Sequence, residues 1–219
     1  MSMAELEREA PDSLMLTGFW YRALPSNQVT RGRLHKAMLQ QFQHNRPRKY
    51  WVLKGFHGLR LKEFFATYPD ANLLWLHRDP VQVAASRTMM MADILDGIVG
   101  PIDLMVEAKK HLEMTRASIA NTMTNPMVDD PRILHLPYTD FIADPIGTVR
   151  RYYAFCGRPL TGKAEAAMRD YLAYNRGDRY GKFRYSTSLL TDIGENLEDL
   201  HAEFAPFRER FGVGIETRD

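Results

Sequence analysis

The chain has 219 residues, of which 45% are hydrophobic, so it is long and apolar enough to bury a core of its own. Its 29 basic and 27 acidic residues leave a net charge of +2 without a block of like charge, which argues against wrapping of nucleic acid and docking on an anionic membrane. Composition therefore predicts a globular protein, and we expect a single domain over residues 1–219.

Residues 1–13 are polar and acidic rather than an apolar signal core, and no run approaches the roughly 18 apolar residues of a spanning helix. Cys156 is the only cysteine, which excludes a disulfide framework and a thiolate metal site and suits a reducing compartment. The seven histidines form no closely spaced pair that would predict a metal site. We therefore expect a cytoplasmic protein without a bound metal.

Apolar residues at helical spacing predict helices over residues 30–45 and 59–68, and short apolar runs at 49–54 and 71–77 predict a strand before and after the second helix. The later part predicts a strand at 132–136, a basic loop at 177–188, and helices at about 80–95, 101–123, 144–156, 161–174 and 195–211. This alternation predicts a helix-rich, layered α/β domain with a mainly parallel sheet. Such sheets bind ligands beyond the carboxyl ends of their strands.

A charged corner follows the most apolar predicted strand, in the stretch LLWLHRDPVQVAAS, residues 73–86. Asp79 is a typical N-cap and Pro80 a typical first helical residue, so a helix should begin at Pro80. Ser86 then lies two turns along the same helix face, where its hydroxyl and the Arg78 guanidinium can converge on one anion. The alternative is structural: Asp79 caps the helix, Arg78 pairs with it or with solvent, and Ser86 is a small residue at a helix contact.

Two other functions are suggested by short stretches and are not supported by the rest of the sequence. His77, Arg78 and Asp79 also match the His-Arg-Asp start of a kinase catalytic loop. The asparagine that this loop requires is replaced by Ala84, and no GxGxxG or DFG motif occurs. The basic and aromatic stretch GDRYGKFRYS resembles a binding loop for single-stranded nucleic acid. One such loop in a chain of net charge +2 is weak support, so we expect no nucleic-acid partner.

Several segments together resemble the sulfotransferases that use 3′-phosphoadenosine 5′-phosphosulfate (PAPS). They are WVLKGFHGLRL with YPDANLLWLHRDPVQVAAS, then LPYTDFIADPIGTVRRYYAFCGRPL, then GKFRYS before FAPFRERFGV, and they run from residue 51 to residue 213. Any one segment alone would be a weak signal, whereas their joint order and spacing is specific. The resemblance implies a three-layer, P-loop-NTPase-like α/β fold and PAPS as co-substrate.

The resemblance also implies roles for particular residues. Arg78 and Ser86 match the arginine and serine that bind the 3′-phosphate of the nucleotide, and Tyr138 matches a tyrosine near the adenine. A late basic loop closes over the nucleotide in this family, which implies a place near the 3′-phosphate and adenine for Lys182, Arg184, Tyr185 and Ser186.

Sulfuryl transfer requires a base for the acceptor hydroxyl and cations for the charge that develops on the leaving oxygen. His57 is the candidate base, with an ordinary pKa of about 6.5, and Lys54 is the candidate for stabilising the sulfuryl oxygens. The family pattern would put the histidine at position 58, where this chain has Gly58, so a loop histidine without a catalytic role is the alternative. We expect the acceptor to be a small, apolar molecule with a hydroxyl or amine.

The family also begins with a strand, a glycine-rich phosphosulfate-binding loop and a helix. Residues 1–50 contain only Gly18 and Gly32, which are too isolated to form that loop. We therefore expect the first strand–loop–helix unit to be missing, either because the chain is N-terminally truncated or because it has diverged. The functional alternatives are an active sulfotransferase, an inactive remnant that binds PAPS or its product 3′,5′-adenosine diphosphate (PAP), and an unrelated α/β interaction domain.

Overall fold

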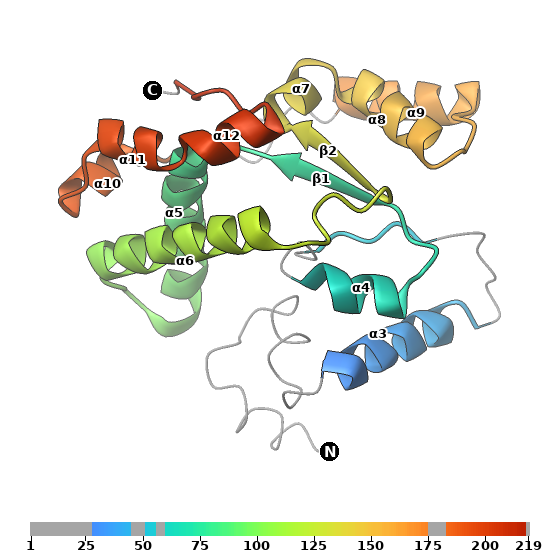
Figure 1. Ribbon diagram of the computed structural model, residues 1–219, viewed down its shortest axis with the longest axis horizontal. Coiled ribbons are helices and arrows are strands. Elements are labelled where there is room, and N and C mark those ends of the chain that lie inside the picture. Colours follow the sequence, from blue (N-terminus) through green and yellow to red (C-terminus); the bar gives the residue numbers. More distant parts are fainter. Residues whose placement is uncertain (1–27, 45–50, 56–59, 175–182, 218–219) are drawn as a thin grey trace. The chain divides into compact units, whose positions relative to one another are not determined.

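The computed structural model describes residues 28–44, 51–55, 60–174 and 183–217 (Figure 1). Internal contacts divide the chain into two compact units, residues 1–71 and 72–219, and each is described by itself below. The single domain expected from the sequence stays a prediction. No helix within the described ranges has the combined length and apolar character needed to cross a bilayer.

The first unit contains a pair of neighbouring helices, α3 (Gln28–Phe42) and α4 (Leu61–Thr67), at the positions that the apolar spacing predicted. Leu61 and Phe65 of α4 are buried. A Cβ at Gly32 would clash with the Thr67 hydroxyl, so the glycine lets the two helices approach closely.

The strand predicted over residues 49–54 is not formed in its described part. Residues 51–54 belong to no sheet, and the Val52 side chain is 85% exposed. An apolar run predicts a strand only if a partner strand and a covering layer satisfy its backbone groups and bury its side chains. The βαβ unit predicted here is therefore absent from the described residues.

The second unit is built on two parallel strands, β1 (Leu73–His77) and β2 (Ile133–Pro137), paired in register from Leu73 opposite Ile133 to His77 opposite Pro137. Figure 1 shows both arrows pointing the same way, with a helix following each of them. The parallel pairing confirms that part of the expected α/β architecture. The two strands therefore end side by side, at one edge of the sheet.

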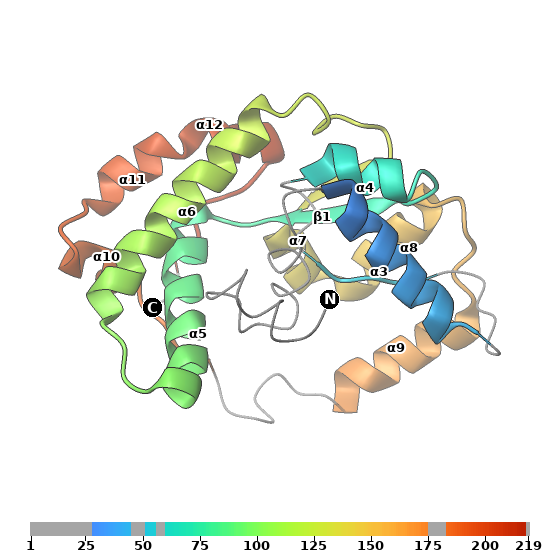
Figure 2. The ribbon, with the colours of Figure 1, turned by 90° about the horizontal axis from the view of Figure 1, so that it is seen from below.

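Helices make up most of the rest of this unit. Two long ones, α5 (Pro80–Val99) and α6 (Leu104–Thr124), lie side by side in Figures 1 and 2. The others are α7 (Tyr138–Ala143), α8 (Pro145–Phe155), α9 (Gly162–Tyr174), α10 (Ser188–Asp192), α11 (Leu197–Glu203) and α12 (Ala205–Phe211). Helix α5 begins where the sequence predicted, because Asp79 caps it and Pro80 is its first residue.

Three features of the helices differ from the sequence-based expectation. The short helices α7, which directly follows β2, and α10, which precedes the last predicted helix, were not predicted. The helix predicted over 195–211 is divided at Phe204 into α11 and α12. Pro206 has no backbone N–H to donate to the preceding turn, so a continuous helix would leave a carbonyl there without its partner.

The core of the second unit has two clusters. One joins the inner faces of α5, α6, α10 and α11 through the side chains of Val81, Ala84, Leu112, Leu190, Leu200 and Phe204. The other packs α12 and the segment after it against the loop that precedes β2, through Val128, Phe207, Phe211 and Val213. The second cluster anchors the segment 213–217 beside the ends of the strands, which is the edge where the candidate site lies.

Candidate functional site: an arginine at the strand ends

The register of the sheet brings two residues to the same edge. Arg78 is the first residue after β1 and Tyr138 is the first after β2, and the residues before them, His77 and Pro137, are directly paired. The Arg78 guanidinium carbon lies 4.9 Å from the centroid of the Tyr138 ring. This is the edge at which parallel α/β sheets bind their ligands.

The Arg78 guanidinium is paired with a carboxylate from far along the chain. Its Nε lies 3.0 Å from both carboxylate oxygens of Glu216, and its Nη2 lies 2.8 Å from Oε2. The side chains are 17% and 8% exposed, respectively. Arg78 thus already binds an anionic group through the two-pronged contact that guanidinium groups form with carboxylates and phosphates.

A second ring lies beside the same guanidinium. Tyr185 comes from the segment before α10, its hydroxyl accepts a hydrogen bond of 2.5 Å from Arg78 Nη2, and its ring centroid lies 5.8 Å from the guanidinium carbon. Tyr138 and Tyr185 therefore both contact Arg78, although they lie on different segments. Aromatic rings beside a guanidinium restrict its movement and stabilise its charge.

Backbone and side-chain groups at the start of α5 hold the residue that pairs with Arg78. Asp79 is fully buried, and its Oδ2 accepts the backbone N–H of Glu216 at 3.1 Å while its Oδ1 caps the helix at Val81 N. The Gln82 side-chain amide donates to the Glu216 carbonyl at 2.9 Å. Asp79 thus joins the helix start to the segment after α12.

The charge of this site is well defined. Burial works against a charged guanidinium, but the hydrogen bonds and charge of Glu216, together with Tyr185, outweigh it and raise the pKa of Arg78. The group therefore remains a cation over the whole physiological range of pH. The arrangement can bind one anion at a time in the fork formed by Nε and Nη2.

The other residues predicted for the site are not all brought to Arg78. Ser86 lies in the second turn of α5 and is partly buried, Arg184 is exposed, and the Ser186 hydroxyl accepts the backbone N–H of Ser188 at 3.1 Å. Lys54 belongs to the first unit and its side chain is exposed. His57 and Lys182 lie outside the described residues. The structure thus groups Arg78 with Tyr138 and Tyr185, and the roles of all the predicted site residues stay predictions.

The sequence analysis did not predict the contacts of Glu216 and Gln82 at this site. It also did not predict that Asp79, besides capping α5, accepts the backbone N–H of Glu216. Gln82 could have been found from its spacing, because residues 82 and 86 are four apart and share a helix face. Glu216 gave no such signal, because it follows the last predicted helix in a segment without periodicity. Among the described residues, no cluster of three or more His, Cys, Asp or Glu side chains suited to hold a metal ion occurs.

Comparison with known proteins identifies the family to which the chain is similar. The family model described as "Sulfotransferase family" matches residues 11–162 of the chain. The matched range includes Arg78, Ser86 and Tyr138, and it ends before the segments that carry Tyr185 and Glu216. A comparison with curated proteins gives no match.

A solved structure has the same fold. The crystal structure of the sulfotransferase STF9 from Mycobacterium avium matches with a TM-score of 0.69 and 23% sequence identity, over 89% of this chain and 50% of that chain. At this identity the likeness shows the fold alone, which is the expected α/β sulfotransferase fold. The present chain spans about half the length of that protein.

Proposed function

The chain belongs to the sulfotransferase family, and from this premise we propose that it binds PAPS at the carboxyl ends of β1 and β2 and transfers the sulfuryl group to a small molecule. The observation that supports the proposal most strongly is the two-pronged contact of Arg78 with a carboxylate, next to the rings of Tyr138 and Tyr185. A phosphate presents oxygens to a guanidinium in the same planar, two-pronged way.

In the proposed complex, Arg78 binds the 3′-phosphate through Nε and Nη2. Ser86 donates its hydroxyl to the same phosphate from the second turn of α5, and Tyr138 lies near the adenine. Arg184, Tyr185 and Ser186, with Lys182, close over the nucleotide. The fork selects for a phosphate because a guanidinium binds a dianion in a partly buried site more strongly than it binds a neutral group.

The proposed reaction is a displacement at sulfur. The acceptor's hydroxyl or amine forms a new bond to sulfur, the bond from sulfur to the bridging oxygen of PAPS breaks, and PAP leaves with the electron pair. His57 takes the acceptor's proton and Lys54 stabilises the sulfuryl oxygens. No metal is required, because the charge that develops on the bridging oxygen is balanced by protein cations.

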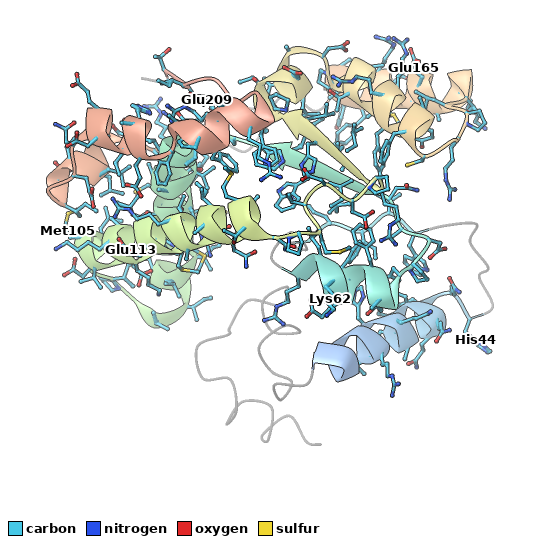
Figure 3. All side chains as sticks on the ribbon, viewed as in Figure 1. His44, Lys62, Met105, Glu113, Glu165 and Glu209 are labelled. Atoms are coloured by element: carbon cyan, nitrogen blue, oxygen red, sulfur yellow. The ribbon has the colours of Figure 1, made fainter. Side chains whose placement is uncertain are left out.

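Calorimetric titration with PAP tests the nucleotide site. We expect measurable binding that is lost in Arg78→Ala. Arg150→Ala is the matched control, because Arg150 also forms a two-pronged contact with a carboxylate, that of Glu165, but on the exposed surface of α8 and α9 (Figure 3). An absence of PAP binding by the unaltered protein would overturn the proposal, as would equal effects of the two substitutions.

A turnover assay separates an active enzyme from a protein that only binds nucleotide. Transfer of a radiolabelled sulfuryl group from PAPS to 2-naphthol, lost in His57→Ala, is the expected result. Binding of PAP without transfer to any hydroxyl or amine acceptor in a panel would instead support the inactive remnant. The family match does not support the third alternative, an unrelated interaction domain.

A further inference from the structure

The two-pronged contact of Glu216 with Arg78 has a consequence for nucleotide binding. Arg78 Nε and Nη2 together form one planar edge, and three contacts of 2.8 to 3.0 Å fill that edge with the Glu216 carboxylate. A phosphate that uses the same edge cannot bind while the carboxylate is there. Resting on the proposed function, we propose that Glu216 is an intramolecular competitor of the nucleotide, and that its displacement opens the site.

The backbone of Glu216 is also hydrogen-bonded, and these bonds hold its carboxylate against Arg78. Its N–H donates to Asp79 and its carbonyl accepts from Gln82, so both backbone polar groups of Glu216 are hydrogen-bonded to the start of α5. The Asp79 N–H points to Glu216 Oε1 at 3.4 Å. That N–H, next to Arg78 in the chain, would otherwise be open to a phosphate oxygen. The carboxylate therefore covers the arginine and its neighbouring backbone donor.

The segment can leave without unfolding the domain. Val213 is buried against Phe207 and Phe211, which anchors the chain just after α12, whereas Gly214 and Ile215 are exposed. Gly214 has no side chain to restrict its dihedral angles. Only the part of the segment beyond Val213 must move, and this movement breaks the contacts of one side chain and two backbone groups. The core cluster behind it stays intact.

The charges of the two groups favour replacement of the Glu216 carboxylate on Arg78 by a phosphate of the nucleotide. A phosphate monoester carries about −1.5 to −2 charges at pH 7, against −1 for a carboxylate, and both find the same cation. The displaced Glu216 becomes solvated, and its hydration offsets part of the free energy lost when its ion pair is broken. The nucleotide therefore displaces Glu216 at sufficient concentration. Its apparent affinity is lower than its affinity for the open site, in proportion to the fraction of molecules in which Arg78 is open.

The test compares PAP affinity in the unaltered protein and in Glu216→Gln. Glutamine keeps the shape of the side chain and removes the charge that competes with phosphate. If about one molecule in ten has an open fork, the substitution should tighten PAP binding by about tenfold. Glu209→Gln is the matched control, because Glu209 lies on the exposed side of the neighbouring helix α12 (Figure 3), and its affinity should equal that of the unaltered protein.

Each outcome of this titration is decisive. Tighter binding by Glu216→Gln, abolished again by adding Arg78→Ala, supports the competitor. Equal or weaker binding by Glu216→Gln, with Arg78-dependent binding retained in the unaltered protein, overturns the competitor and leaves the proposed function standing. In that case Glu216 serves only to position Arg78. If neither protein binds PAP, the proposed function fails and the competitor fails with it.

A second measurement needs no substitution, and so does not depend on the variant's folding. Hydrogen exchange of the unaltered protein should show that the amide of Glu216, which donates to Asp79, exchanges faster when PAP is added. Amides of β1 should keep their protection under the same conditions, because the sheet is not disturbed. Unchanged or slower exchange at Glu216 with PAP bound would contradict displacement.

Discussion

His77 on β1 and His135 on β2 are joined by a direct hydrogen bond between their rings, with 2.6 Å from His77 Nε2 to His135 Nδ1. The other ring nitrogen of His135 lies 2.8 Å from the Val128 carbonyl, which can only accept, so His135 Nε2 carries the proton and His77 Nε2 donates to His135 Nδ1. Phe211 stacks on His77 with 3.9 Å between ring centroids. The strand-end histidines thus hydrogen-bond to each other, and His77 packs against Phe211.

This pair predicts that stability falls with acid. Burial, and secondarily the neighbouring His135, lower the pKa of His77 to about 3, and burial lowers that of His135. Each ring is neutral when folded and becomes protonated on unfolding below its ordinary pKa of 6.5. The contribution to stability is therefore complete above pH 6.5 and is lost as pH falls from there toward 3, by up to about 1.4 kcal/mol per pH unit for His77.

Urea unfolding at a series of pH values between 7.5 and 4.5 measures this loss. The slope of the unfolding free energy against pH should be smaller in His77→Phe, which removes one titrating ring and keeps an aromatic side chain against Phe211. An NMR titration in which the His77 ring protons shift with a midpoint near 6.5 in the folded protein would contradict the assignment.

Ser86→Ala should weaken PAP binding by about tenfold to a hundredfold. A hydrogen bond from a hydroxyl to a charged phosphate contributes about 1.5–3 kcal/mol, and alanine removes it with little change of helix packing. Calorimetry measures the loss. Adenosine 5′-monophosphate, which lacks the 3′-phosphate, is the control ligand, and its weaker binding should be the same in both proteins. A loss that is equal for both nucleotides would place Ser86 away from the 3′-phosphate.

The ring of Tyr138, rather than its hydroxyl, should matter at the site. Its face lies against the Arg78 guanidinium, and such a contact contributes about 0.5–2 kcal/mol. Tyr138→Phe keeps the ring, so PAP affinity should change little. Tyr138→Leu removes it, and affinity should fall by roughly two- to thirtyfold. The idea fails if the phenylalanine and leucine variants bind PAP alike.

Asp79→Ala should destabilise the protein by about 2–4 kcal/mol, because it removes the cap of α5 and leaves the Glu216 N–H without its acceptor. Asp103→Ala is the matched control. Asp103 caps α6 through hydrogen bonds to Met105 N and Val106 N that are exposed, so its loss should cost only about 1 kcal/mol. Urea unfolding compares the two, and equal losses would show that the buried contact with Glu216 adds nothing.

Arg116 should contribute more to stability than an ordinary surface arginine. It lies on α6 and contacts the carboxylates of Glu113, Glu195 and Glu203, so alanine would leave these negative charges without their shared cation. We expect a loss of about 1–2 kcal/mol at low salt, shrinking as salt screens the charges. Arg169→Ala, which breaks one exposed pair with Glu165 within α9, should cost at most about 0.5 kcal/mol. A salt-independent loss for Arg116→Ala would point to packing instead of charge.

Local features of the sequence determined much of the second unit. The Asp79–Pro80 pair predicted the start of α5, and the apolar runs before Arg78 and around residue 134 predicted the two strands. Caps, proline and side-chain periodicity act within a few residues, so they can be read without knowing the rest of the fold. The same reasoning placed Arg78 at the carboxyl end of a strand, where the structure has it.

Only the tertiary structure decided what Arg78 contacts. Glu216 is 138 positions away, and it reaches the strand ends because Phe207, Phe211 and Val213 pack the end of α12 against the sheet region. Long-range contacts also explain why residues 51–54 do not form the predicted strand, because an apolar run becomes a strand only where a partner strand exists. Long-range packing chooses among partners that local patterns allow. The sequence by itself therefore determined where the anion-binding arginine stands, and the fold decided that a carboxylate of the chain occupies it.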